Sequence, residues 1–225
     1  MTYKKSGLSE SKNISDSTIR RLSMYLRTLN FLEDKGIVTI SSQKLAEIEG
    51  LTSAQIRKDL SYFGSFGRRG LGYNVTSLRK KITSILGLDR QWNIILVGAG
   101  HLGKALLNYE EFKKKQLNIT RIFDKNPDLI GKKIKELTIE HVDDLEKSVD
   151  PKNESLAIIA IPPQDVQSIT DRLGSIGIKG ILYFASRTVT VPKNVVIRNE
   201  DTTVELETLT FHITNKTTRP IKAFH

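Results

Sequence analysis

A glycine-rich hexapeptide in the middle of the chain has the spacing of a phosphate-binding turn. Its G-x-G-x-x-G pattern is formed by Gly98, Ala99, Gly100, His101, Leu102 and Gly103. In such a turn the first glycine permits a tight bend, the second lets backbone N–H groups reach a pyrophosphate, and the third lets a helix pack closely on a strand. The apolar run before the hexapeptide and the helical pattern after it predict that strand and that helix.

An acidic residue at a suitable distance strengthens this interpretation. Asp124 lies 21 residues beyond Gly103, at the end of the next apolar run. A carboxylate there accepts hydrogen bonds from both ribose hydroxyls and repels a 2′-phosphate, so the sequence favours NAD(H) over NADP(H). The positive charge of the neighbouring Lys125 weakens the preference for NAD(H), because it would attract a 2′-phosphate. A glycine-rich turn that packs without binding a ligand remains the alternative.

A second group of polar residues lies in the stretch "SAQIRKDLSYFG". Ile56, Leu60 and Phe63 fall on one helical face, which leaves the basic side chains on the opposite face. Arginine and lysine pair with guanine O6 and N7 in a major groove, while serine and tyrosine hold phosphates. This pattern favours a recognition helix over a solvated charged face. The predicted contacts from the helix are Arg57, Lys58, Ser61 and Tyr62.

The stretch "GSFGRRGLGY" follows, and its glycine density is too high for a helix. It predicts a two-stranded hairpin whose tip carries Arg68 and Arg69, which would enter a minor groove. Three helices precede it: one from Ser15 to about Gly36, a short one in "SSQKLAEIEG", and one in "LTSAQIRKDLSYFG", where Thr52 and Gln55 have capping-box spacing. The order predicts a winged helix-turn-helix, with a further helix in "SLRKKITSILGL".

From Asn93 the pattern changes to buried strands that alternate with helices. The predicted elements are the strand "IILVGAG", a helix to about Leu117, the strands "TRIFDKNP" and "SLAIIAIPP", a helix over 165–176, and the strand "GILYFA". Continuous apolar strands imply a parallel sheet covered on both faces, so the fold class is α/β. The tail "TTVELETLTFHITNK" fits a strand and a helix equally well by periodicity.

Composition limits the classes of function. The 225 residues carry a net charge of +10, with 16 basic and 8 acidic residues in 1–90 against 19 and 17 in 91–225. This asymmetry indicates a polyanionic partner, either nucleic acid or an anionic membrane face, although a solvated basic surface is the alternative. No apolar run reaches about 18 residues and no signal peptide is recognisable, so we expect a soluble, cytoplasmic protein.

Several kinds of chemistry are not expected. The chain has no cysteine, and its four histidines lack metal-ligand spacing, so we expect neither a disulfide framework nor a metal site. A dehydrogenase needs a proton-transfer group and substrate-binding residues beyond the nucleotide fold. Only 25 residues follow residue 200, where the nucleotide fold is expected to end. We therefore predict no enzyme: the dinucleotide is sensed and not consumed.

The chain resembles the Rex family of redox-sensing transcriptional repressors. The matching segments are "SAQIRKDLSYFGSFGRRGLGY", "GAGHLGKALLNY", "EHVDDLE", "SITDRLGSIGIKGIL" and "VELETL". The resemblance implies a homodimer with winged helices on pseudo-palindromic operator DNA, NAD(H) in each Rossmann domain, and a C-terminal helix exchanged between subunits. The domains would be 1–88 for DNA binding, 89–200 for NAD(H) and 201–225 for dimerisation. It also implies that NADH releases the protein from DNA, whereas NAD⁺ competes without releasing it.

The resemblance further implies three switch residues, Arg21, Tyr109 and Asp201, which would exchange hydrogen bonds and ion pairs between two states. From the residues alone, Tyr109 is equally a core tyrosine, Asp201 a helix N-cap and Arg21 a phosphate contact. We also expect Pro162, Phe184 and Ala185 to line the pocket that distinguishes NADH from NAD⁺.

Three positions depart from the family pattern, Tyr183, Ser186 and Thr202, and these would tune that discrimination. Two further functions remain open: a minimal NAD-dependent oxidoreductase, and a DNA-binding protein without NADH discrimination whose Rossmann domain only dimerises.

Overall fold

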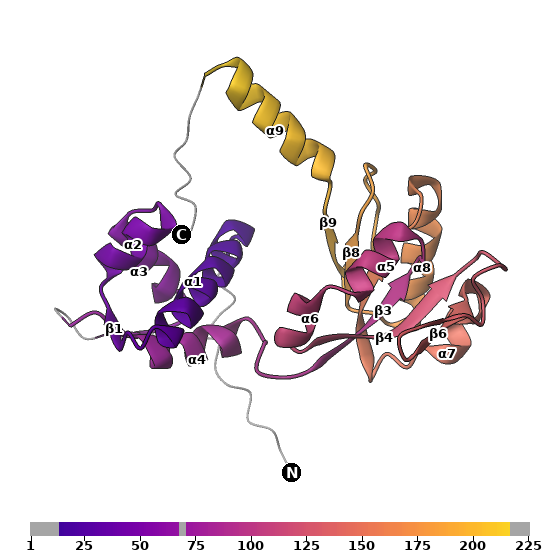
Figure 1. Ribbon diagram of the computed structural model, residues 1–225, viewed down its shortest axis with the longest axis horizontal. Coiled ribbons are helices and arrows are strands. Elements are labelled where there is room, and N and C mark those ends of the chain that lie inside the picture. Colours follow the sequence, from indigo (N-terminus) through magenta and orange to yellow (C-terminus); the bar gives the residue numbers. More distant parts are fainter. Residues whose placement is uncertain (1–13, 68–70, 217–225) are drawn as a thin grey trace, which may run out of the picture. The chain divides into compact units, whose positions relative to one another are not determined.

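The computed structural model describes residues 14–67 and 71–216, which form two compact units that divide between Asp89 and Arg90 (Figure 1). The first unit is mainly helical, and the second is built around a sheet. The hydrophobic cores divide in the same way, because the core of the first unit shares no residue with the two cores of the second. Each unit is described by itself below.

The first unit begins with helix α1 (Asp16–Asp34), followed by α2 (Ser42–Glu49), α3 (Ser53–Ser61) and α4 (Val75–Ile85). These helices start where the sequence supplies caps, since Ser15, Ser41 and Thr52 each accept a hydrogen bond from the backbone nitrogen three residues later. Gly50 ends α2 in the left-handed conformation with a φ of 67°. The four predicted helices of this unit are therefore confirmed.

The predicted pairing within residues 64–73 differs from the structure. Strand β2 (Tyr73–Asn74) pairs antiparallel with β1 (Thr39–Ile40), which precedes α2. No described residue of 64–67, nor Leu71, belongs to a strand. A strand of two residues is too short to show periodicity, and its partner lies more than 30 residues away along the chain. The predicted tip residues Arg68 and Arg69 lie outside the described residues.

The second unit contains a seven-stranded sheet in the order β5-β6-β4-β3-β7-β8-β9. Every neighbouring pair is parallel except β5 with β6. The strands are β3 (Trp92–Val97), β4 (Leu117–Asp124), β5 (Lys133–Ile134), β6 (Leu137–His141), β7 (Glu154–Ile159), β8 (Gly180–Tyr183) and β9 (Val196–Asn199). The sequence predicted β3, β4, β7 and β8, whereas β5, β6 and β9 were missed.

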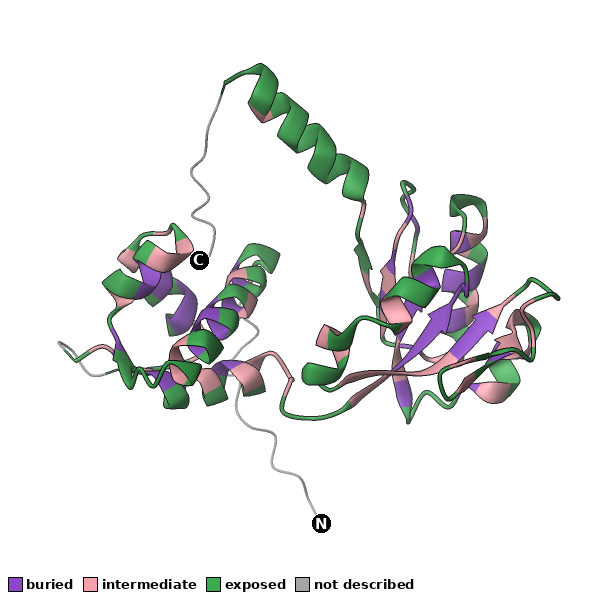
Figure 2. Ribbon diagram, viewed as in Figure 1, coloured by how far each residue is buried: buried purple, intermediate pink, exposed green. Residues whose placement is uncertain are grey.

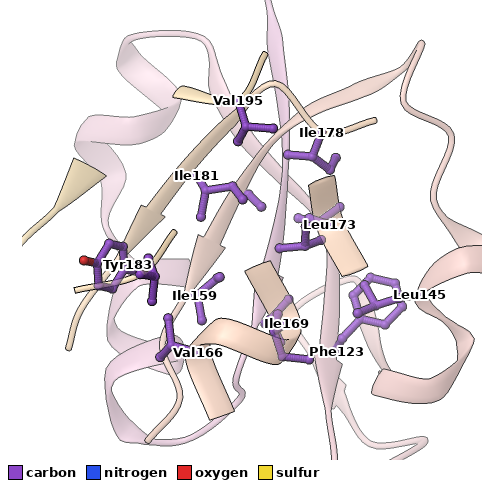
Figure 3. Packing of buried hydrophobic residues seen from close by; sticks show 14 of the residues in the cluster. Phe123, Leu145, Ile159, Val166, Ile169, Leu173, Ile178, Ile181, Tyr183 and Val195 are labelled. Carbon is purple, nitrogen blue, oxygen red and sulfur yellow. The ribbon is translucent and has the colours of Figure 1, made fainter. Parts of the chain in front are cut away.

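The central strand buries side chains on both faces of the sheet, as predicted. Ile95 and Val97 of β3 belong to one core, while Ile94 and Leu96 belong to the other. The first core packs beneath α7 (Leu145–Ser148) and α8 (Val166–Ile176), where Leu173 meets the sheet (Figure 3). Apolar residues on α5 (His101–Leu107) and α6 (Glu110–Lys114) pack against the second core.

The predicted helix from the hexapeptide to Leu117 is wrong in its length. It is interrupted after α5, resumes as α6, and Leu117 already begins β4. At the interruption the carbonyl of Lys104 accepts two hydrogen bonds from Asn108, one from its side-chain amide at 2.9 Å and one from its backbone N–H at 3.2 Å. The break places Tyr109 between the two helices, where it is the N-cap of α6, instead of within one helix.

The ambiguous tail is a helix, α9 (Thr202–Thr214), with Asp201 as its N-cap. Nearly all of it is exposed, as Figure 2 shows. The exposed set includes large apolar side chains, namely Val204, Leu206, Leu209, Phe211 and Ile213. An isolated helix with this many exposed apolar residues is marginal in water, so α9 has the character of a helix that packs against another surface.

None of the described helices is both long and apolar enough to cross a lipid bilayer.

Candidate functional site

The glycine turn joins β3 to α5, and its three glycines differ in their surroundings. Gly98 has a φ of 106°, and a Cβ added there would lie 2.3 Å from the carbonyl oxygen of Ala160. A Cβ on Gly103 would lie 1.9 Å from the oxygen of Gly98. A Cβ on Gly100 would meet no atom within 4 Å. The first and third glycines therefore allow close packing, and the second faces open space.

This arrangement fits the dinucleotide site that the sequence predicts. The turn lies where the strand order reverses, because β4 and β7 flank β3 on opposite sides. In sheets of this kind, ligands bind beyond the carboxyl ends of the strands at such a reversal. The open space at Gly100 is the cradle that a pyrophosphate requires, whereas a side chain there would fill it.

A pocket of about 250 Å³ lies beside the turn. Its wall combines residues that follow three neighbouring strands, β3, β4 and β7, with residues from the start of α8. The lining that carries the argument consists of Gly98, Gly100, Asp124, Lys125, Pro162 and Asp165. The structure thus brings Gly98, Gly100, Asp124, Lys125 and Pro162 together around one hollow, whereas Gly103 does not line it.

Asp124 occupies the last position of β4 and is tied to the glycine turn. One carboxylate oxygen accepts a hydrogen bond from the backbone nitrogen of Ala99 at 2.6 Å, and the other accepts one from Asn126 at 2.8 Å. Each carboxylate oxygen has two acceptor positions, so both oxygens retain capacity for ribose hydroxyls. Asp124 can therefore shape the turn and bind a ribose at the same time.

Lys125 is paired across the pocket. Its ammonium group lies 2.7 Å from a carboxylate oxygen of Asp165, which directly precedes α8. Both side chains are at least one third exposed, so the pair contributes little to stability. The negative charge of Asp165 does, however, offset the positive charge of Lys125. Lys125 therefore attracts a 2′-phosphate less strongly, and the repulsion of that phosphate by Asp124 dominates.

The remaining predicted dinucleotide residues lie in other environments. His101 and Leu102 are exposed at the start of α5. Phe184 and Ala185 follow β8 and pack into the two opposite cores of the sheet, and neither lines the pocket. Their role beside the nicotinamide stays a prediction.

The predicted DNA-binding residues lie on the outer face of α3. Ile56 and Leu60 are fully buried, whereas Arg57 and Lys58 are exposed, as the helical pattern predicts. Arg57 donates to the hydroxyl of Ser42 at 3.1 Å, and this links α3 to the start of α2. The hydroxyl of Ser61 donates to the backbone carbonyl of Lys58, and Tyr62 is half-buried at the end of the helix.

A groove of about 540 Å³ runs beside this face. Its lining includes Arg57 and residues of the loop that follows α3. It also includes small polar residues, namely Ser41, Ser42, Ser61 and Ser65. Hydroxyl groups around an arginine supply the neutral and charged donors that bind phosphate oxygens. Ser41 and Ser42 were missed because in the sequence they read only as the start of a helix.

The inner face of α3 contains a buried carboxylate. Asp59 is fully buried and accepts hydrogen bonds from the side chains of Arg21, Tyr25 and Gln55. Burial by itself would raise the pKa of Asp59, but the hydrogen bonds from Arg21, Tyr25 and Gln55 outweigh it and hold that pKa below its usual value. Gln55 uses its amide for Asp59, so only the Thr52 half of the predicted capping box is present.

The three predicted switch residues have separate partners. Arg21 forms a bidentate pair with Asp59 at 2.6 and 2.8 Å, and removing it would strand a buried charge at a cost of about 3–5 kcal/mol. Tyr109 is exposed and packs edge-on against Phe112. Asp201 caps α9 by accepting from the backbone and hydroxyl of Thr203, and hydrogen bonds from Thr203 and Ser186 lower its pKa. Their joint switch role stays a prediction.

The positions that depart from the family pattern have structural roles of their own. Tyr183 is buried, and its hydroxyl donates to the carbonyl of Arg187 at 2.8 Å. Ser186 supplies its hydroxyl to Asp201, and Thr202 is the first residue of α9. Asp165, which sequence reasoning also missed, was signalled only by its place two residues after a pair of prolines that follow a strand.

Two family models match the chain. Residues 13–61 match the "Putative DNA-binding protein N-terminus", and residues 89–187 match the "CoA binding domain". The first match contains α1, α2 and α3, and the second contains the glycine turn and the pocket.

Similar curated proteins share nearly the whole chain. The redox-sensing transcriptional repressor Rex of Carboxydothermus hydrogenoformans is 48% identical over 89% of this chain and 96% of its own. The protein of the same name from Clostridioides difficile is 45% identical over 89% of this chain and 95% of its own.

Solved structures agree with these relatives. The crystal structure of RSP in complex with beta-NAD+ and operator DNA has a TM-score of 0.87 at 38% identity, and covers 92% of this chain and 95% of RSP. The complex of RSP with beta-NADH has a TM-score of 0.83 at 37% identity, and covers 92% and 97%. RSP is described as a Rex-family repressor. At this identity and coverage, the chain belongs to the Rex family of redox-sensing transcriptional repressors, and not to a family of enzymes.

Proposed function

We propose that this protein represses transcription by binding operator DNA, and that NADH in the pocket beside Gly100 lowers its affinity for that DNA. The observation that carries the proposal is the presence in one chain of a glycine turn with open space at Gly100 and a helix that presents Arg57 and Lys58 outward. The relatives support it, since RSP has been crystallised with NAD⁺ and operator DNA and, separately, with NADH. A regulator of this kind acts in the cytoplasm, where bacterial DNA lies.

The dinucleotide is held by the turn and its surroundings. The pyrophosphate lies against Gly98, Ala99, Gly100 and Gly103, with His101 and Leu102 at the rim. Asp124 binds the adenosine ribose and excludes a 2′-phosphate, so the ligand is NAD(H) and not NADP(H). Pro162 provides apolar surface near the nicotinamide. NADH lacks the positive charge of the NAD⁺ ring, and an apolar wall therefore favours the reduced form.

DNA is bound by the outer face of α3 and the groove beside it. Arg57 and Lys58 reach base edges or phosphates in the major groove, while Ser61 and Tyr62 contact the backbone. Arg68 and Arg69 extend the contact into the minor groove. The exposed positive charge of Arg57 and Lys58 and the serine hydroxyls of the groove support this assignment.

Two copies are required for the regulation. The exposed apolar residues of α9 support a homodimer in which this helix packs against a second subunit, and an exchanged α9 satisfies their burial. A twofold dimer reads a pseudo-palindromic site with half-sites one helical turn or more apart. NADH lowers the affinity for DNA only to the extent that it binds the state of the dimer that cannot bind DNA more tightly than the state that can. A 100-fold decrease in DNA affinity requires a coupling free energy of about 2.7 kcal/mol.

A competition titration tests the proposal. A duplex selected from a random library by the protein itself serves as the operator, and binding is followed by fluorescence anisotropy at fixed salt. We expect NADH to release the operator at least tenfold more effectively than NAD⁺ does, and NADPH to act only weakly. An operator complex that persists at saturating NADH would refute the proposal, and so would steady oxidation of NADH by the protein with carbonyl substrates.

A further inference from the structure

The recognition helix α3 has a buried carboxylate between its DNA-facing residues and its apolar face. Asp59 directly follows Arg57 and Lys58, yet its side chain is fully buried. One oxygen lies 2.6 Å from Arg21 Nε and 2.7 Å from the Tyr25 hydroxyl. The other lies 2.8 Å from Arg21 Nη2 and 2.8 Å from the amide of Gln55. The strongest donors therefore come from α1.

Stability alone does not explain this choice of residues. A buried ion pair recovers little more than the cost of desolvating its two charges, and apolar residues of the same volume often serve as well. Leu22 and Leu29 on α1 and Ile56 and Leu60 on α3 already supply apolar contacts to this core. What the ion pair adds is direction, because the planar guanidinium donates its two parallel hydrogen bonds to a carboxylate only within its own plane.

Direction matters on α3 because each residue along a helix is rotated by about 100° from the last. A rotation of α3 about its own axis would carry Arg57 and Lys58 away from the groove side. Hydrophobic packing tolerates such rotations in small steps, whereas the two-pronged contact from Arg21 to Asp59 does not. The contact to Asp59 can thus fix the rotation of α3 about its axis, and with it the direction in which Arg57 and Lys58 point.

We infer that Arg21 and Tyr25 are positioning residues for DNA recognition, which act through Asp59 to hold α3 in the rotation that aims Arg57 and Lys58 at the bases. This inference rests on the proposed function. It assigns to Arg21 a place inside the protein, in contrast to a phosphate contact. The sequence-specific part of binding depends on the network, while the non-specific attraction of the basic surface to phosphates does not.

A matched control exists on the same helix. Glu33 of α1 lies 2.5 Å from Arg79 of α4, and both side chains are about one third exposed. This pair also joins α1 to a neighbouring helix, but α4 carries no residue that we assign to DNA. Loss of the Glu33 pair therefore shows how DNA binding changes when α1 is held less firmly to a neighbouring helix while the rotation of α3 is unchanged.

The experiment measures a specificity ratio in the full-length protein. Dissociation constants are determined for the selected operator and for a scrambled duplex of equal length and composition, at one salt concentration. The proteins are the wild type, Asp59→Asn, Tyr25→Phe and Glu33→Gln, each shown to be folded by circular dichroism. The ratio cancels the general effect of net charge, because Asp59→Asn raises the attraction to both duplexes.

We expect Asp59→Asn to lower the ratio at least tenfold and Tyr25→Phe about threefold, while Glu33→Gln stays within twofold of the wild type. Unchanged NADH affinity in all four proteins will show that the second unit is intact. Ratios within twofold of the wild type for both Asp59→Asn and Tyr25→Phe would overturn the inference. If Asp59→Asn does not fold, the specificity ratio of Tyr25→Phe tests the inference by itself, because this substitution removes one O–H donor and keeps the ring.

The proposed function and this inference are refuted by different results. A wild-type protein that prefers no duplex refutes the proposed function, and this inference with it. A wild-type protein with a clear preference, together with variants that keep it, refutes the inference alone.

Discussion

The carboxylate of Asp124 accepts a hydrogen bond from the backbone nitrogen of Ala99 at 2.6 Å, so the end of β4 is tied directly to the glycine turn on β3. The residue that we assign to the ribose therefore also fixes the turn that we assign to the pyrophosphate. These two parts of a dinucleotide site are usually discussed as separate recognition elements. Here one side chain joins them.

Asp124→Asn should change the choice between dinucleotides and keep the turn. Asparagine retains one oxygen that can accept from Ala99, but it loses the negative charge and the oxygen that accepts from Asn126. Hydrogen bonds to charged groups contribute about 1.5–3 kcal/mol, so we expect NADH affinity to fall roughly tenfold or more. NADPH affinity should fall less or rise, since the repulsion of its 2′-phosphate is removed. Isothermal titration calorimetry measures both, and an unchanged ratio of the two affinities would contradict the role of Asp124.

Two substitutions in the turn should have opposite effects on folding and binding. Gly100→Trp places a side chain in open space, so we expect a stable protein that no longer binds NADH and still binds its operator. Gly103→Ala places a Cβ 1.9 Å from the oxygen of Gly98, and such overpacking costs about 1–3 kcal/mol or more. Thermal unfolding and NADH titration of both variants check this. A destabilised Gly100→Trp protein would show that the space is not open in solution.

Lys58→Ala should weaken DNA binding without any effect on the dinucleotide. If Lys58 contacts a phosphate, the slope of log affinity against log salt should decrease by about 0.9, whereas a base contact should cost about 1–3 kcal/mol on the operator alone. Lys193→Ala is the control, because Lys193 is an exposed lysine of the second unit. Anisotropy titrations between low and moderate salt distinguish these cases. Equal losses in both variants would mean that net charge alone drives binding.

The sequence predicted most of this architecture because its main signals are local. Apolar spacing identified α1 and α3, and continuous apolar runs identified the strands on either side of the glycine turn. The missed features depend on partners that are distant in the chain. Strand β2 pairs with β1 across two intervening helices, and neither strand is long enough to show a period.

The same distinction applies to the candidate sites. Gly98, Asp124 and Lys58 were predictable because a motif or a helical face places them. Asp59 was not, since an acid between Lys58 and Leu60 looks like one more polar surface residue until α1 supplies Arg21 and Tyr25. Asn108 likewise gave no signal strong enough to indicate that α5 would end there.

Substitution of the apolar residues on α9 should dissociate the dimer. Leu209 and Phe211 are exposed by more than half, and Leu209→Asp would place a charge in any surface that buries this helix. We expect sedimentation velocity to give a dimer for the wild type and a monomer for the variant at micromolar concentration. Thr210→Ala on the same helix should remain dimeric. A dimeric Leu209→Asp protein, or a monomeric wild type, would place the subunit contact elsewhere or exclude it.

The Asp59 network should make the first unit sensitive to acid. The hydrogen bonds from Arg21, Tyr25 and Gln55 outweigh burial and lower the pKa of Asp59 in the folded state, so between that pKa and the unfolded value of about 3.9 the unfolded chain binds more protons. The stability that the carboxylate contributes is therefore complete above pH 5 and is lost as the pH falls through the folded pKa. Asp59→Asn should cost about 3–5 kcal/mol at pH 7 and flatten this acid transition.

Tyr25→Phe provides the intermediate case for the same titration. It removes one donor that lowers the pKa of Asp59, so the folded pKa lies closer to the unfolded value. The loss of stability should therefore begin at the same pH as in the wild type, but be smaller and be complete at a higher pH. Urea titrations between pH 2.5 and 6, followed by hydrogen–deuterium exchange in peptides from α1 and α3, separate this unit from the sheet-containing one. Identical acid transitions in all three proteins would mean that folding does not change the pKa of Asp59, because only a carboxylate that takes up a proton on unfolding in acid can produce the predicted order.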